Sequence, residues 1–133
     1  MIRRNVQCQG DVIEIQDDIV LIQMNDLQLQ AADVVRIQGS EVQIQGDMVQ
    51  IQAKKLQIQA KTLRIQAKSV LEIQADVMQI EADVTQIQAG KVQFQVNRGN
   101  FSGDLSIHTN TSINSIWQGS TITVDGSIHY ITN

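Results

Sequence analysis

The sequence contains no proline, a single cysteine and only four aromatic residues among its 133 positions. With Cys8 alone the chain can form no intrachain disulfide, which excludes a disulfide-stapled secreted scaffold. No run of about 18 apolar residues is present to span a bilayer as a helix, and the N-terminal stretch lacks the apolar core of a signal peptide. We therefore expect a chain that is soluble when made and that uses another route for any export.

Charge is sparse as well, and basic residues are not in excess. The chain has 10 Lys and Arg against 14 Asp and Glu, with a formal net charge of -4 and an isoelectric point near 4.9. This balance provides no basic groove for a phosphate backbone, so no nucleic-acid partner is expected.

What the sequence has instead is a short repeat made from few residue types, with 19 Ile and 21 Gln. A pair formed by an apolar residue and Gln recurs thirteen times, with Glu replacing Gln once. The pairs begin at Cys8, Ile15, Ile22, Leu29, Ile37, Ile44, Ile51, Ile58, Ile65, Ile73, Ile80, Ile87 and Phe94. Ten of the twelve intervals are seven residues, and the two that begin at Leu29 and Ile65 are eight. This self-similarity predicts a repetitive shaft over residues 1–96.

The pattern inside each unit distinguishes a β-strand from a coiled coil, although both are compatible with a seven-residue period. In the unit Val49–Lys55, apolar residues stand at the first, third and fifth positions. On a helix these positions point to about 0°, 200° and 40°, so no single apolar face forms. On a strand they lie on one side, and Gln50 and Gln52 lie on the other. Each unit is therefore predicted to be a five-residue strand followed by a two-residue corner.

Because seven is an odd number, a straight chain would reverse its apolar face at every unit, so each corner must turn the chain and keep that face inward. The predicted fold is an all-β triangular β-helix. Its core is predicted to contain Ile15, Ile22, Leu29, Ile37, Ile44, Val49, Ile51, Leu56, Ile58, Leu63, Ile65, Ile73, Ile80, Ile87 and Phe94. The corners are predicted at Asp11, Asp18, Asn25, Asp47, Lys54, Lys61, Lys68, Asp76, Asp83 and Gly90, all polar or small. Leu21 at an outward position and Thr85 at an inward position depart from the pattern.

Glutamine at the outward positions suits strands that are stacked on one another. Strands in successive layers lie about 4.8 Å apart, so each residue meets its equivalent in the next layer. Stacked charges repel, whereas neutral amides form hydrogen-bonded ladders. Alanine at the third inward position fits a narrow corner that Val or Ile would overfill.

Two windings accommodate such units. A single chain can wind around a triangle with three units in each coil, or three chains can wind around one axis, each adding one strand to every layer. We expect the second, an intertwined homotrimer that extends the thirteen repeats to roughly 60 Å at about 4.8 Å per layer. Its units are all equivalent, neighbouring chains cover its strand edges, and no insertion typical of solenoids interrupts residues 7–96.

The composition changes at Asn97. Of the residues 97–133, 16 are Ser, Thr or Asn, and a turn is predicted at 97–100. Strands are predicted at 105–107, 120–124 and 127–131. We expect this segment to close the shaft as a tip. The tip residues are Trp117, Ile128, Tyr130 and Ile131, of which Trp117 and Tyr130 are expected to pack as core plugs.

These features carry a resemblance to a known family. Tandem units such as Val49–Ala53, Leu56–Ala60 and Leu63–Ala67 precede a Ser/Thr/Asn-rich closing segment that contains Thr121–Gly126. In this arrangement the sequence resembles the central spike, or cell-puncturing protein, of contractile-tailed bacteriophages and the related VgrG spike of type VI secretion. The repeats indicate the architecture of the shaft rather than one particular system.

The resemblance implies a trimeric β-helix at the distal end of the tail baseplate of a virion, made in the host cytoplasm. Sheath contraction would drive it through the outer membrane of the target cell. The implied partners are two further copies, the baseplate and tail components, and the bacterial outer membrane. Family members commonly carry an N-terminal docking domain, whereas the repeats begin here by Gln7. The chain is therefore expected to be a shaft-and-tip fragment or to be attached by other means.

Some members of this family hold an apical iron ion through a His-x-His motif. Here His108 and His129 stand in separate stretches of the closing segment, each as a single histidine. Both are expected to point outward, because the preceding Ile107 and Ile128 are expected to point inward. No metal or other cofactor is therefore predicted, and His129 and His108 are the candidate ligands if an iron ion lies on the axis.

No catalytic site is predicted, since no Ser/His/Asp order, glycine-rich phosphate loop, CxxC or HExxH motif is present. Asp17 and Asp18 are adjacent on a strand and would face opposite ways, which does not suit a pair of catalytic carboxylates. Lys54, Lys61 and Lys68 form either a solvated edge or a basic belt for lipopolysaccharide phosphates. The alternative to a piercing spike is a single-chain β-solenoid with an adhesin-like surface-binding role.

The inward and outward assignment predicts a large difference between two neighbouring substitutions. Ile58→Asp places an unpaired charge in a dry core and is expected to lower stability by about 4 kcal/mol or more, or to prevent folding. Gln59→Glu stays in solvent and is expected to be tolerated. Thermal unfolding of the two variants measures the difference, and equal heat resistance would contradict the assignment.

Overall fold

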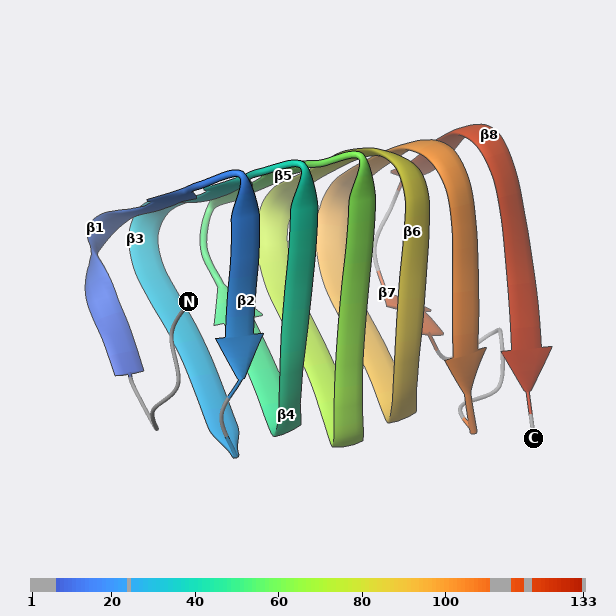
Figure 1. Ribbon diagram of the computed structural model, residues 1–133, viewed down its shortest axis with the longest axis horizontal. Helices are drawn as coiled ribbons and strands as arrows, with labels where there is room; N and C mark the ends of the chain where they lie inside the picture. Colours follow the sequence, from blue (N-terminus) through green and yellow to red (C-terminus); the bar gives the residue numbers. More distant parts are fainter. Residues whose placement is uncertain (1–6, 24, 111–115, 119–120, 133) are drawn as a thin grey trace.

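The computed structural model describes all residues except 1–6, 24, 111–115, 119–120 and 133. Its strands are β1 (Gln7–Gln16), β2 (Ile19–Gln23), β3 (Asp26–Gln38), β4 (Glu41–Gln52), β5 (Lys55–Gln59), β6 (Thr62–Thr109), β7 (Trp117–Gln118) and β8 (Thr121–Thr132). They form a parallel β-solenoid of about five coils, with β1 at one end and β8 at the other (Figure 1). The all-β class and the β-helix expected from the repeat are confirmed.

The strand partners show how the chain winds. Every strand pair is parallel, and a residue pairs with its equivalent three units later, as Gln7 does with Gln28 and Asp26 with Met48. Three repeat units therefore complete one coil. The last coil is slightly longer, because Arg98 pairs with Thr121.

The described chain thus has the single-chain winding, which the sequence left as the alternative to three intertwined chains. Its strands take their hydrogen-bond partners from the same chain, one coil away. Both windings place three units in each turn around the axis, and the seven-residue period alone does not separate them. The two windings differ in which units are neighbours. In the described chain, units three apart in the sequence are adjacent. In the intertwined arrangement, consecutive units of different chains would be adjacent.

The two eight-residue intervals are accommodated at corners. Gly10 pairs with Ala31 and Val12 with Val34, so the extra residue of the first long interval lies at the corner after Ala31. The same shift occurs where Gly46 pairs with Ala67 but Met48 pairs with Val70. Because each extra residue lies at a corner, the inward register is unchanged on both sides of it.

The interior is a continuous apolar core. Fourteen of the fifteen predicted core residues, from Ile22 to Phe94, are at most 2% exposed, and Ile15 in the first coil is partly buried. Thr85, the inward exception, is also buried, at 2% exposure, whereas Leu21 on the outside is partly exposed. Among the described residues, no buried side-chain nitrogen or oxygen lacks a hydrogen-bond partner. Full burial of each Ile or Leu is worth about 1.5–3 kcal/mol, which makes this core the main source of stability.

The turn predicted at residues 97–100 is wrong. These residues lie inside β6, which runs from the shaft into the closing segment without interruption. Asn97 continues a corner column, because its Nδ2 donates to Oδ1 of Asp76 one coil earlier at 3.3 Å. A polar, turn-like composition here makes a corner of the solenoid rather than a loop that leaves it.

The closing segment adds a last coil with a glycine corner. Gly103 and Gly126 have φ angles of 97° and 137°, a region that favours glycine, and they are stacked over Ala82 at successive coils. A Cβ atom at either position would overlap backbone of the coil below. Of the predicted tip residues, Ile128 and Tyr130 pack partly buried against the core, whereas Ile131 is 51% exposed. The side chain of Trp117 lies outside the described residues.

Pairs of cysteines distinguish the two windings. In a Cys8→Ala background, Gln45→Cys with Gln66→Cys is expected to give an intrachain disulfide, because these side chains face each other on adjacent strands and their Nε2 and Oε1 atoms are 2.9 Å apart. Adjacent strands, about 4.8 Å apart, are within the Cα separation that a disulfide needs. Non-reducing gels and thiol counting measure the result.

The matched pair is Gln45→Cys with Gln52→Cys in the same background. These residues lie on different faces of the described coil, so no cross-link is expected. In three intertwined chains, residue 52 of a neighbouring chain would lie beside residue 45, whereas residues 45 and 66 of one chain would be about 14 Å apart, or three layers. Interchain cross-linking of the matched pair would therefore contradict the single-chain winding.

Candidate functional site

The outer wall has three faces with different chemistry. Face A consists of Gln28, Gln30, Gln50, Gln52, Glu72, Gln74, Gln93 and Gln95. Face B consists of Glu14, Gln16, Arg36, Gln38, Gln57, Gln59, Gln79 and Glu81. Face C consists of Leu21, Gln23, Gln43, Gln45, Arg64, Gln66 and Gln88. Face A therefore consists of glutamines with one glutamate, Glu72. Face B carries charges of both signs, and face C carries one arginine, Arg64.

Amide ladders connect successive coils on all three faces. On face A, Nε2 of Gln30 donates to Oε1 of Gln52 at 2.9 Å, and Gln52 donates onward to Gln74 at 3.2 Å. Gln45, Gln66 and Gln88 form the same chain on face C. In each of these bonds the residue of the earlier coil is the donor. The ladder predicted from the sequence is present, and it fixes the outward side chains without charge.

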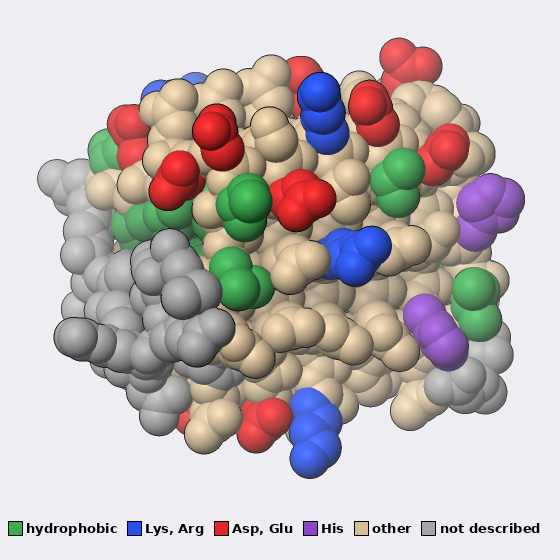
Figure 2. Space-filling view, viewed as in Figure 1, with side chains coloured by type: hydrophobic (Ala, Val, Ile, Leu, Met, Phe, Trp, Pro, Cys, Tyr) green, Lys and Arg blue, Asp and Glu red, His purple; other side chains and the backbone are tan. Residues whose placement is uncertain are grey.

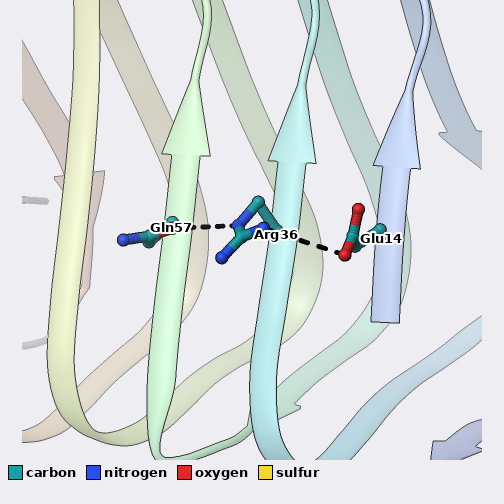
Figure 3. A network of polar contacts seen from close by, with 3 residues as sticks. All are labelled: Glu14, Arg36 and Gln57. Atoms are coloured by element: carbon teal, nitrogen blue, oxygen red, sulfur yellow. Dashed lines mark hydrogen bonds and ion pairs between the residues drawn. The ribbon is translucent and has the colours of Figure 1, made fainter. Parts of the chain in front are cut away.

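Face B contains an ion pair. Arg36 on β3 lies between Glu14 on β1 and Gln57 on β5 (Figure 3). Its Nη1 is 3.7 Å from Oε1 of Glu14, and its Nε donates to Oε1 of Gln57 at 3.0 Å. Both charged side chains are about half exposed. A pair of this exposure contributes little free energy, about 0.2–1 kcal/mol, so Arg36 mainly replaces an amide in the column.

A groove follows each of three corner columns of the solenoid. The first, about 740 Å³, is lined by residues 30–32, 52–54, 74–76 and 95–97. The second, about 710 Å³, runs past residues 45–47, 66–68 and 88–90 to His108 and Asn110. The third, about 520 Å³, is lined by residues 16–18, 38–40 and 59–61. Small residues at the third inward position, such as Ala53 and Gly46, form the floor, and glutamines form one wall.

The lysines lie one in each groove rather than in one column. Lys54, Lys61 and Lys68 occupy three different corners of the solenoid. The backbone N–H of Asp76 donates to the carbonyl of Lys54, and that of Asp83 to the carbonyl of Lys61. Lys54 and Lys61 thus each have an aspartate as neighbour in the next coil. A mixed corner is a solvated edge rather than a concentrated basic belt.

The histidines lie near the end that carries β8 (Figure 2). His108 is partly exposed at the end of the second groove, and His129 is exposed. They are on adjacent strands, but His129 pairs with Ser106 and His108 with Ile131, so they are not directly opposite. Within the described ranges, no group of three or more His, Cys, Asp or Glu side chains could hold a metal ion.

The acidic pair examined as a catalytic candidate lies at a corner. Asp17 and Asp18 connect β1 to β2, and Oδ1 of Asp17 accepts a hydrogen bond from the backbone N–H of Asp18 at 2.8 Å. They form an exposed turn at one end of the third groove, so the corner predicted at Asp18 is confirmed and the strand expected for the pair is wrong. Their hydrogen bond stabilises the corner conformation.

An alignment of the units at a spacing of seven does not reveal that the three faces differ. A comparison of every third unit, the spacing of one coil, would have separated face A from faces B and C and placed Lys54 and Lys61 beside aspartates. No protein-family model matches the chain, and comparisons with curated proteins and with solved structures gave no match. The described part of the chain contains no helix of the length and apolar character needed to cross a bilayer.

Because side chains of successive coils are stacked, the effect of an added charge on stability depends on whether its column already contains a like charge. The triple variant Gln30→Glu, Gln52→Glu and Gln74→Glu puts three carboxylates in one face A column and removes both ladder bonds. Two stacked pairs at about 1 kcal/mol each predict a loss of about 2 kcal/mol in unfolding free energy. Urea unfolding at low salt and at 1 M salt measures this loss, which screening is expected to reduce.

The control is Gln30→Glu, Gln38→Glu and Gln45→Glu, with one carboxylate on each face. It adds the same charge without stacking it, so it is expected to lose markedly less stability and to respond less to salt. Equal losses in the two triple variants would contradict the column arrangement.

Proposed function

We propose that this chain is the shaft and closing end of a structural, membrane-piercing spike on a contractile tail. The observation that carries the proposal is the uninterrupted solenoid. Among the described residues, only short corners separate the strands from Asp26 to Thr109, and no inserted loop leaves the coils. The resemblance of the repeat units to cell-puncturing spikes is the second support.

The physical properties of the rod suit this role. Each internal coil is hydrogen-bonded along its backbone to the coil before and the coil after it, and its core is closed to water. A rod of this kind resists bending and unfolds slowly, as transmission of a contraction force requires. Its amide wall offers few fixed charges to retard passage through an envelope.

We favour one chain per rod. In three intertwined chains, Lys54, Lys61 and Lys68 of different chains would be stacked in adjacent layers at every corner, which places like charges about 5 Å apart. In the described winding Lys54 and Lys61 have aspartate neighbours instead. The baseplate and the outer membrane are the partners in this proposal, and the homotrimer expected from the sequence is not part of it, because that expectation rested on the intertwined winding.

The test uses contractile particles that contain the chain. Antibody labelling is expected at the distal end of the baseplate. Particles that carry the Ile58→Asp chain are expected to contract without admitting an outer-membrane-excluded dye to target cells, whereas Gln59→Glu particles admit it. Equal dye entry with particles that lack the chain would contradict a piercing role.

A second candidate is a surface-binding module, and the corner grooves favour it. Their amide walls and small-residue floors could bind a neutral polymer of a cell surface through hydrogen bonds. The purified chain separates the two functions without contraction. A binding module is expected to sediment with target cells and to lose binding when the exposed groove residues Gln30 and Gln95 are changed to Glu, whereas a spike segment is expected to stay in solution.

A further inference from the structure

The last coil of the solenoid leaves one strand edge open. β8 pairs with β6 along one side, and no described strand pairs with its other side. In Figure 1 it is the outermost strand at the C-terminal end. The outer edge of a strand of this length presents a row of backbone donors and acceptors, which is a template for another strand.

The apolar interior is open at the same place. Val124, Ile128 and Tyr130 are partly exposed, although they pack against the core. Their partners one coil earlier, Phe101, Leu105 and Ile107, are at most 2% exposed. The exposure therefore comes from their position on the last described strand and not from an outward orientation of these side chains.

We propose that this edge binds the same edge of a second copy, in a twofold dimer joined end to end. A twofold axis perpendicular to the solenoid reverses strand direction, so the two β8 strands would pair antiparallel. The two coils then have identical length and an identical triangular outline. This inference concerns the isolated chain and does not rest on the proposed spike function.

The side chains of β8 are self-complementary in one register. Asp125 and His129 are both exposed and lie on either side of the Gly126 corner. If Asp125 of one copy is opposite His129 of the other, its carboxylate accepts a hydrogen bond from the imidazole N–H, and symmetry provides this contact twice. The same register places Val124 opposite Tyr130, and both of these side chains face the core.

A second copy fits this edge better through β8 than through its first coil. The coil that ends in β8 is longer than the first coil, since Arg98 pairs with Thr121 whereas Gln7 pairs with Gln28. Head-to-tail stacking would therefore join triangles of different length. It would also place Ser- and Thr-rich β8 over β1, which continues the glutamine columns.

The experiment is a charge exchange measured by sedimentation equilibrium over a concentration series. The wild-type chain is expected to reach a mass of twice 14.8 kDa. His129→Asp places two aspartates opposite each other, and Asp125→Lys places lysine opposite histidine. Each is expected to raise the dimer dissociation constant at least about tenfold. The double variant Asp125→Lys with His129→Asp is expected to restore the dimer.

His108→Asp is the matched control, because it changes the same residue type one coil before the edge, opposite Ile131 of β8 in the same chain. It is expected to leave the dimer intact. Circular dichroism of every variant establishes that the solenoid is folded, and concentration-dependent amide-exchange protection of β8 is a second readout. A wild-type monomer at all concentrations, a trimer, or failure of the double variant to restore the dimer would overturn the proposal.

Discussion

Parallel stacking of coils at a constant register is the constraint on which the rest of this structure depends. Once residue 26 is hydrogen-bonded beside residue 48, every later residue lies over its equivalent three units before it. Each side chain then lies between the equivalent side chains of the coils before and after it. A contact that is favourable in one coil is therefore repeated in every coil, and an unfavourable contact is repeated in the same way. The sequence contains few residue types because few types tolerate being stacked on themselves.

Three kinds of column satisfy this constraint. Branched and linear aliphatic residues stack inside, where their burial supplies the free energy of folding. Glutamine stacks outside because its amide both donates and accepts, so each side chain can bond to the coils on both sides of it. Some charged residues are stacked beside an opposite charge, as Glu14 with Arg36 on face B and Lys54 with Asp76 at a corner, and others are stacked on glutamine, as Arg64 on Gln43. The few charges of the wall are placed where the column supplies an opposite or neutral neighbour.

Much of this could be predicted from one unit of sequence. The apolar alternation in Val49–Lys55 gives the strand, the inward side and the need for a corner, and the odd length of the unit gives the closed path. The winding could not be derived in this way, since a period of seven is the same for one chain and for three. The deciding information is the identity of neighbours one full coil apart, where Lys61 meets Asp83 rather than Lys68. The turn predicted at residues 97–100 is wrong for a different reason: turn-forming residues make corners in a solenoid as readily as they make loops.

The two kinds of register irregularity act differently on the stack. An extra residue at a corner, as after Ala31 or Ala67, is absorbed locally and the columns continue on both sides of it. In the closing segment the register change is not absorbed locally. All paired residues of β6 and β8 are 23 positions apart, and Ser, Thr and His replace glutamine in the outward columns. Gly103 and Gly126 maintain the corner there with a positive φ that no other described corner uses. A solenoid of identical coils has no intrinsic end, so a coil that differs in length, wall and corner is what limits further stacking of the same kind and gives this end its own surface.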